Sequence, residues 1–306
     1  MATVTSDFLA GLMTNFKAIF NEALDEAGKI AQLRSIIATE FPSETDKESY
    51  GWMGANPTMS EWKDQRQYKA LKAYSYTLTN VSYEGTIEVN RETLEDDKYA
   101  MIAPRIRGLA SRALRHMNQL TIEALDYGAT GLAYDAAAMF ADTRVIGASA
   151  NIDNLMDGAY SGSTTEVLTA LKAAFAQMQN FTDDQGNKMG LVPDTIIAAP
   201  AMAMLIKEAL LPGVAGTVRP ERGIFDPDKV YSSPWIDADV LDWYVLCTTA
   251  EVKPLIFQLR KAPEFVSLDD PKSDHVFKSR TFLYGVDDRF VVGYGDPRTA
   301  IKITDS

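Results

Sequence analysis

Residues 91–128 decide the fold of this chain: RETLEDDKYAMIAPRIRGLASRALRHMNQLTIEALDYG. Along this stretch apolar residues recur every three or four positions, at Ile102, Ile106, Leu109, Ala113, Met117, Leu120 and Ala124. That spacing places one apolar stripe along one face of an α-helix. The charged residues Arg105, Arg107, Arg112, Arg115 and Glu123 fall between the stripe positions, so the opposite face is predicted to be solvated.

The ends of this helix are marked by a proline and a glycine. Pro104 fits the first turn of a helix, and Gly128 supplies a C-terminal stop. We therefore predict a break near Met101 and a continuous helix from about Ala103 to Tyr127, preceded by a short helical lead-in. Such a helix is about 37 Å long and is expected to cross a whole domain.

Length and composition are those of a globular protein with one large domain or two ordinary ones. The chain has 306 residues, 46% hydrophobic and 24% charged, which supports a buried core and a polar surface. Its net charge of -12 argues against a general nucleic-acid binder, which needs a basic surface. An acidic shell could still enclose a duplex without holding it tightly, and the charge also favours solubility.

The residues that commonly carry chemistry are scarce. The single cysteine, Cys247, excludes an intrachain disulfide and is predicted to be buried in an apolar run. His116 and His275 are too few for a Cys/His zinc site, and the acidic turn 183–187 lacks the ligand spacing of a calcium loop. No nucleophile motif accompanies either histidine. We predict no catalytic residue, no metal and no cofactor, and hence a protein that is not an enzyme.

Two kinds of targeting segment are also missing from the sequence. Residues 1–7 lack the basic and apolar regions of a signal peptide. No apolar run approaches the roughly 20 residues that a membrane span requires. The sequence therefore predicts no membrane association.

The first part of the chain allows two interpretations. Ser6 and Asp7 can cap a helix whose apolar residues, from Phe8 to Leu24, follow at helical spacing, and a second helical patch covers residues 30–37. These residues can belong to the core of their own domain. They can equally form an arm that buries its stripe against a neighbouring subunit, which is the interpretation we favour.

The segment 41–88 differs from the preceding residues, because it is rich in aromatic residues and is predicted to be extended. Glycines and prolines interrupt regular structure, and alternation between Tyr74 and Val89 predicts a strand, a turn and a second strand. An aromatic segment with few aliphatic residues cannot build a core alone, so it is expected to pack on another surface. The alternative is an ordinary hairpin that covers its own domain.

The central part of the chain alternates helix and strand. We predict a short strand near residues 144–146, a helix capped by Ser163, a strand at 195–199 and a helix at 201–211 that Pro200 opens. Further strands are predicted at 243–248 and 255–259. The segment from about 164 to 250 is thus predicted to form an inserted second unit.

The last stretch is rich in predicted strands. One begins at residues 264–266, another alternates from Phe277 to Gly285, and a turn at Asp287-Asp288 leads to a return strand at 289–294. Residues 300–303 close the chain. The long helix and this late sheet are predicted to form one layered unit, which gives an α+β fold class.

Several phrases of the sequence form a recognisable set: YGWMG at 50–54 with Pro57, Met59, Glu61 and Trp62; TIEVNR at 86–91 before LEDD at 94–97; PLIFQ at 254–258 with Arg260, PEF at 263–265 and DP at 270–271; FLYGVD at 282–287; and GYG at 293–295. Taken together, they resemble the major head (capsid) subunit family of Mu-like phages and prophages. The resemblance extends from about residue 41 to the end. Asp296-Pro297-Arg298 departs from the family pattern, where a bulkier aromatic–polar pair is expected, and this concerns only the last strand.

The resemblance implies the HK97-like phage capsid fold. Its parts would be an N-terminal arm at 1–49, an extended loop (a β-hairpin) at 50–90, a peripheral domain with a spine helix and a long antiparallel sheet at 91–163 and 251–306, and an axial domain at 164–250. It also implies a structural major capsid protein without enzymatic activity. Copies would self-assemble as hexamers and pentamers into the icosahedral head of a tailed phage or prophage, around double-stranded DNA.

Further expectations follow from the same resemblance. Scaffold, portal and decoration proteins are expected as partners, and the protein is expected in the virion after assembly in the host cytoplasm. Two other functions stay open from the sequence: a cellular, encapsulin-like shell that encloses protein cargo, and a soluble α+β enzyme of unrecognised type.

Residues of the extended loop are the candidates for contacts between subunits. We hypothesise that aromatic residues act as apolar anchors there, since aromatics contribute much of the binding energy at interfaces. These residues are Trp52, Trp62, Tyr68, Tyr74 and Tyr76. Arg66 and Lys69 would meet acidic groups across the seam. The alternative is that the aromatics pack within one subunit.

Overall fold

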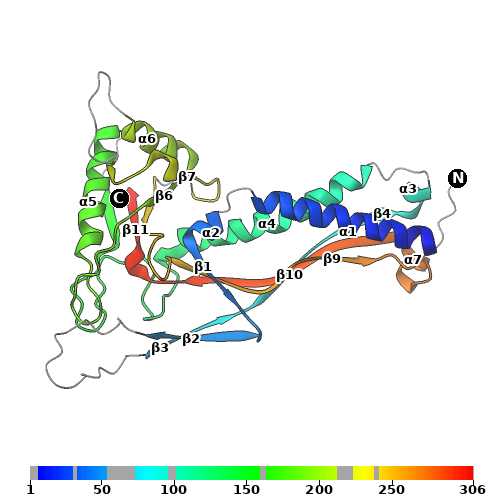
Figure 1. The fold of residues 1–306 in the computed structure, drawn as a ribbon, viewed down its shortest axis with the longest axis horizontal. Helices are drawn as coiled ribbons and strands as arrows, with labels where there is room; N and C mark the ends of the chain where they lie inside the picture. The colour runs from blue at the N-terminus through cyan, green and yellow to red at the C-terminus, as the bar shows by residue number, and fades with distance from the viewer. Residues whose placement is uncertain are drawn as a thin grey trace, which may run out of the picture.

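A computed structural model describes residues 6–29, 33–53, 73–95, 101–158, 163–211, 223–237 and 241–305. It shows an elongated body of two long helices on a long sheet, with a smaller helix-and-sheet unit at one end (Figure 1). The helices are α1 (Ser6–Lys29), α2 (Leu33–Ile37), α3 (Arg91–Glu95), α4 (Ala103–Asp126), α5 (Thr164–Asn180), α6 (Pro200–Leu210) and α7 (Asp274–Ser279). The strands are β1 (Ala38–Pro42), β2 (Lys47–Met53), β3 (Ala73–Thr79), β4 (Val81–Asn90), β5 (Leu155–Gly158), β6 (Thr195–Ala198), β7 (Val230–Ser232), β8 (Trp243–Leu246), β9 (Leu255–Leu268), β10 (Thr281–Tyr294) and β11 (Ala300–Asp305).

The long helix α4 confirms the prediction from its periodicity. It begins at Ala103 with Pro104 in the first turn, ends at Asp126 and runs into a 3-10 turn at Tyr127–Ala129. The buried side chains follow the predicted stripe as far as Met117 and then shift to Ile122 and Leu125.

One face of a four-stranded sheet carries α1 and α4. The strand order is β1-β9-β10-β4, with β9 and β10 antiparallel over most of their 14 residues each. Strand β10 runs without a turn through Asp287 and Asp288, so the predicted turn is wrong. Register shifts there mark a β-bulge, which absorbs an extra residue inside a continuous strand. The predicted strands at 255–259 and 264–266 likewise join in β9.

The end of β9 and the start of β10 are linked by a short helix where an extended segment was predicted. Residues 274–279, including Phe277, form α7, whose N-cap is Ser273 with its hydroxyl accepting from the Val276 amide. This cap favours helical over extended backbone.

The two strands predicted between Tyr74 and Val89 are present as β3 and β4, but they do not pair with each other as the alternative, an ordinary hairpin, requires. Strand β3 pairs with β2, whereas β4 pairs with β10. Only Asn80 separates β3 from β4, and its side-chain amide donates to Ser43 Oγ (2.8 Å) and to the Thr45 carbonyl (2.9 Å). We call the two strands β2 and β3 the ribbon; it leaves the long sheet below β9 and β10 in Figure 1.

Helix α1 lies along α4 within the same chain (Figure 1). Phe16 stacks edge-on against Tyr284 with ring centroids 5.2 Å apart, and Phe20 lies 5.5 Å from Phe265. Both phenylalanines are buried. The apolar stripe of α1 is thus buried by its own chain. The interpretation that we favour from the sequence, burial against a neighbouring subunit, differs from this packing. Strand β1 then adds in parallel to β9.

The second sheet has five strands in the order β5-β11-β8-β6-β7, with α5 and α6 packed on it. The capping box at Ser163, helix α6 after Ala199, and the buried strands β6 and β8 confirm the predictions there. The predicted strand at 144–146 is wrong: these residues form a loop.

Strand β11 lies in this second sheet, although residues 251–306 were predicted as one peripheral unit. It pairs with β5 and β8, and its apolar residues Ile301 and Ile303 join the core around Trp243. Strand β11 lies between β5 and β8 in the sheet order, so the end of the chain completes the layer on which α5 and α6 pack. The division into four parts stays a prediction.

Two further features of the structure concern Cys247 and the apolar character of the helices. Cys247 is buried with 2% of its surface exposed, which confirms its predicted role as a small apolar residue. None of the helices in the described ranges is both long and apolar enough to span a membrane.

Candidate functional site

The ribbon carries three of the predicted contact residues, and its register is clear from the backbone. Trp52 lies opposite Tyr74, and Tyr50 lies opposite Tyr76. Trp62, Arg66, Tyr68 and Lys69 lie outside the described residues, as do the side chains of Trp52 and Tyr74. The role of these six residues between subunits therefore stays a prediction.

Tyr76 makes its contacts inside its own chain. Its phenolic oxygen accepts a hydrogen bond from the Tyr294 amide (3.1 Å), and its ring packs against the core under the second sheet. Burial raises the pKa of the Tyr76 phenol. These contacts favour the alternative interpretation, packing within one subunit, for Tyr76; its predicted role as an anchor between subunits is untested.

A chain of hydrogen bonds fixes the ribbon to the long sheet. Tyr50 donates through its hydroxyl to Gln258 Oε1 (2.8 Å), and Gln258 Nε2 donates to Asn80 Oδ1 (2.8 Å). Gln258 and Asn80 are buried, so each polar group needs the partner that it has here. No local pattern in the sequence indicates these hydrogen bonds, because the residues that they join are up to 208 positions apart.

The turn that leads into the ribbon is capped by Glu48. Its Oε1 accepts from the Ser43 hydroxyl (2.9 Å), the Glu44 amide (3.0 Å) and the Thr45 amide (3.1 Å). These bonds, the Ser43 hydroxyl first, hold the pKa of the Glu48 carboxyl below its usual value. An ion pair between Arg289 and Asp46 ties the same turn to β10. The Glu48 hydrogen bonds and the Arg289–Asp46 ion pair therefore hold the start of the ribbon in place relative to the long sheet.

The face of the long sheet opposite the helices is partly apolar and partly acidic. Even-numbered residues of β10 from 282 to 290 are buried, so the odd-numbered ones point to the other face. On that face Val266 and Leu268 of β9 are 40% and 42% exposed. We call this surface the outer face.

An acidic row crosses the outer face beside these apolar residues. Glu264, Asp287 and Glu84 lie opposite one another on β9, β10 and β4. Lys261 Nζ bridges Glu264 (2.8 Å) and Asp287 (2.7 Å). Three carboxylates thus face one lysine, and the row keeps a net negative charge that can attract a basic segment.

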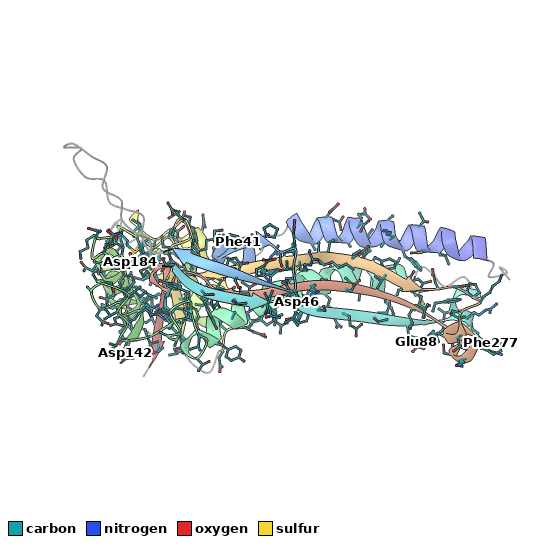
Figure 2. All side chains as sticks on the ribbon, turned by 90° about the horizontal axis from the view of Figure 1, so that it is seen from below. Phe41, Asp46, Glu88, Asp142, Asp184 and Phe277 are labelled. Carbon is teal, nitrogen blue, oxygen red and sulfur yellow. The ribbon has the colours of Figure 1, made fainter. Side chains whose placement is uncertain are left out.

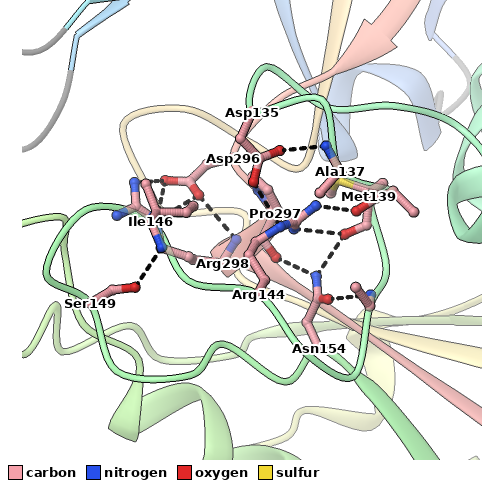
Figure 3. A network of polar contacts seen from close by, with 12 residues as sticks. Asp135, Ala137, Met139, Arg144, Ile146, Ser149, Asn154, Asp296, Pro297 and Arg298 are labelled. Carbon is pink, nitrogen blue, oxygen red and sulfur yellow. Dashed lines mark hydrogen bonds and ion pairs between the residues drawn. The ribbon is translucent and has the colours of Figure 1, made fainter.

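A second polar network joins the loops of the smaller unit (Figure 3). The side chains of Asp296 and Arg298 are both nearly buried and pair through Arg298 Nη2 (2.7 Å), with a further bond from Nε (2.8 Å). Although burial opposes it, the Asp296 carboxylate raises the pKa of the Arg298 guanidinium. Asp296-Pro297-Arg298 is the departure from the family pattern noted in the sequence, and here it builds the entry to β11.

Two further residues extend that network. Arg144 pairs with Asp135 (3.0 Å) and donates to the Met139 carbonyl (3.1 Å), while Asn154 Nδ2 donates to the Met139 and Pro297 carbonyls (2.9 and 2.8 Å). Every one of these contacts lies within the chain. The network is therefore structural, and it holds the 131–154 loop against the start of β11.

The contacts of His116 and of the acidic turn at 183–187 contribute to packing and to turn structure. His116 meets the Tyr83 ring edge-on with centroids 4.7 Å apart, and burial lowers its pKa. Asp183 Oδ1 accepts from the amides of Gln185 and Asn187, which confirms the predicted turn. Across the described ranges, no group of three or more His, Cys, Asp or Glu residues is placed to hold a metal ion.

The far end of the long body carries an exposed phenylalanine on α7. Phe277 and Glu88 mark it in Figure 2, opposite the smaller unit that carries Asp142 and Asp184. Phe277 is 85% exposed. The molecule thus presents three surfaces suited to contacts with other chains: the ribbon, the outer face and this end.

Comparison with known proteins agrees with the resemblance seen in the sequence. The model of the family described as Mu-like prophage major head subunit gpT matches residues 9–164 and 226–305. The chain is 25% identical over 295 residues to the Mu-like prophage FluMu major head subunit of Haemophilus influenzae, covering 96% of the chain and 72% of that protein. It is also 25% identical over 303 residues to the major capsid protein of Escherichia phage Mu, covering 98% and 74%.

A solved structure gives the same fold. The subunit in the procapsid of bacteriophage JBD30 superposes with a TM-score of 0.61 at 24% identity, covering 99% of this chain and 77% of that one.

Proposed function

The chain belongs to the Mu-like prophage major head subunit family, and we propose that its copies close into an icosahedral head by docking the ribbon of one subunit on the outer face of the next. Family membership makes it a structural major capsid protein with the HK97-like fold. It favours this function over an encapsulin-like shell protein and over a soluble enzyme. The absence of catalytic activity itself stays part of the proposal.

The outer face is the observation that supports this docking. The helices α1 and α4 cover one face of the long sheet, whereas exposed Val266 and Leu268 lie beside an acidic row on the other. Apolar surface beside charge is typical of an interface. A two-stranded ribbon is marginally stable alone and gains stability from a surface to pack on.

The segment between β2 and β3 has the complementary chemistry. We propose that Trp62 and Tyr68 anchor on the apolar part of a neighbouring outer face, and that Arg66 and Lys69 meet its acidic row. Trp52 and Tyr74 would flank the contact. Such a contact joins different surfaces of two subunits, so it repeats head to tail and closes into hexamers and pentamers.

The remaining partners follow from the same role. Double-stranded DNA would be enclosed without sequence preference, and a chain of net charge -12 would hold it weakly. Scaffold, portal and decoration proteins would complete the head. The protein would then reside in the virion after assembly in the host cytoplasm.

Sedimentation of the purified protein, with negative-stain images of the fastest fraction, tests assembly. We expect closed shells, rings or sheets. Trp62→Ala should reduce the assembled fraction far more than the solubility of the subunit. Trp235→Ala, at a tryptophan packed against the core, should reduce both together. Equal losses for Trp62→Ala would show that Trp62 is a core residue and would contradict the proposed docking.

A further inference from the structure

Helix α4 has two flanks, and the described residues cover only one of them. On the flank toward β9, α1 packs its phenylalanines against Tyr284 and Phe265. On the flank toward β4, the described part of the chain leaves a groove of about 530 Å³. Strand β4 is the last strand of the long sheet, so the groove runs beside a sheet edge that lacks a strand partner among the described residues.

The floor of this groove is apolar and its helix rim is basic. Ile87, Leu109 and Val286 lie in the floor, and Arg112 and Arg115 of α4 form the helix rim. The strands contribute two carboxylate residues to the lining, Glu84 and Asp288. Both arginines are exposed, and neither makes an ion pair within the described ranges. The groove therefore combines a surface that excludes water with two guanidinium groups ready for carboxylates.

The covered flank shows what fits such a surface. There the apolar stripe of α1 lies on the helix, while Arg107 pairs with Glu22 (2.7 Å) and with Glu26 (3.5 Å) of α1. The same helix thus receives an apolar segment with carboxylates on one flank. The other flank has a similar apolar surface with arginines, so it suits a segment that is also apolar and carries carboxylates.

We propose that the groove between α4 and β4 receives an apolar, acidic segment of a second copy of this chain in the assembled head. Charge favours this occupant, because the helix rim presents two arginines and the chain has 42 acidic against 30 basic residues. The open edge of β4 can hold an extended segment by main-chain hydrogen bonds. The inference rests on the proposed assembly, but it concerns a surface other than the ribbon and the outer face.

The test uses the full chain and a cysteine placed in the groove. Gln119 lines the groove, and the native Cys247 is buried, so Gln119→Cys gives one reactive thiol. We expect a fluorescent maleimide to label it about tenfold more slowly in purified shells than in unassembled subunits, since an occupied groove excludes the reagent. Equal labelling rates in shells and subunits would overturn the inference while leaving the proposed function intact.

Charge reversal provides an independent measurement. The double variant Arg112→Glu/Arg115→Glu should raise the protein concentration needed for assembly by about tenfold or more, because like charges would then meet across the contact. Arg105→Glu is the matched control, since Arg105 is an exposed arginine of α4 outside the groove. Unchanged circular dichroism and melting temperature would show that both variants fold.

Three other experimental results would each overturn the inference. Equal effects of the double variant and Arg105→Glu would overturn the inference. Protection of Cys at position 119 that disappears after nuclease treatment would assign the arginines to phosphate groups and overturn it as well. Wild-type protein that stays monomeric at every concentration would contradict both this inference and the proposed function.

Discussion

The hydroxyl of Tyr50 donates a 2.8 Å hydrogen bond to Oε1 of Gln258, which lies 208 residues further along the chain. Tyr50 belongs to the ribbon and Gln258 lies near the start of β9, so this bond connects the projecting strands to the long sheet. Gln258 is fully buried and passes the connection on to Asn80. The direction in which the ribbon leaves the body depends on this contact.

Tyr50→Phe should lower the free energy of unfolding of the unassembled subunit by about 1–3 kcal/mol, because it leaves a buried acceptor without its donor. Urea unfolding measures the change. Tyr127→Phe is the control, at a tyrosine that is 65% exposed, and it should have no measurable effect. Equal stability of Tyr50→Phe and wild type would mean that the bond does not form in solution.

Phe16→Ala tests whether α1 packs on its own chain. Phe16 is 1% exposed and contacts Tyr284, so truncation should cost about 3–5 kcal/mol in the unassembled subunit. Phe277→Ala removes a phenylalanine that is 85% exposed and should leave subunit stability unchanged. If Phe16→Ala left the subunit equally stable and impaired only assembly, α1 would be an arm that binds a neighbour.

Arg298→Gln should destabilise the subunit by about 3–5 kcal/mol, because it leaves the buried Asp296 carboxylate without its charge partner. Thermal or urea unfolding at neutral pH measures this loss. Lys278→Gln breaks the exposed pair with Asp274 and should cause no measurable change. Similar small effects of both variants would contradict the buried ion pair.

The stability of the subunit is expected to depend on pH through Asp288. Burial, with a smaller contribution from Asp287, raises the pKa of the Asp288 carboxyl from 3.8 to about 6 in the folded protein. Between these two values the folded state holds a proton that the unfolded state has released, so this group lowers stability as the pH rises and has its full effect above about pH 6.

Asp288→Asn should therefore stabilise the subunit by about 1–3 kcal/mol at pH 7, and the gain should vanish toward pH 4. Urea unfolding at a series of pH values measures the difference. Asp142→Asn, at an exposed loop aspartate, is the control. A gain of the same size at pH 4 and pH 7 would show that the titration of Asp288 is not its cause.

The sequence alone determined the elements whose signals are local. The spacing of apolar residues and the positions of Pro104 and Gly128 predicted α4 to within one residue at its end. Ser163 as an N-cap predicted the start of α5, and the structure shows that Glu166 completes a capping box there. Helix periodicity and caps depend on residues three or four positions apart, so they can be read without knowledge of the rest of the chain.

The tertiary structure decided which strands continue and which strands pair. Asp287-Asp288 reads as a turn in the sequence, but β9 and β4 on either side hold β10 straight through it with a bulge. Asn80 separates two strands with different partners because Ser43 and Thr45 bind its side chain. Such pairings depend on residues distant in the sequence, and alternation alone does not identify them.

The same division applies to the surfaces that can bind other chains. The aromatic ribbon segment and the family resemblance were legible in the residues themselves. The groove beside α4, with Arg112 and Arg115 near the edge of β4, lies on the flank that the described residues leave open, while α1 occupies the opposite flank. A sequence shows that a helix has an apolar face and charged residues beside it. Which of its flanks is covered depends on packing between elements that fold together from distant parts of the chain.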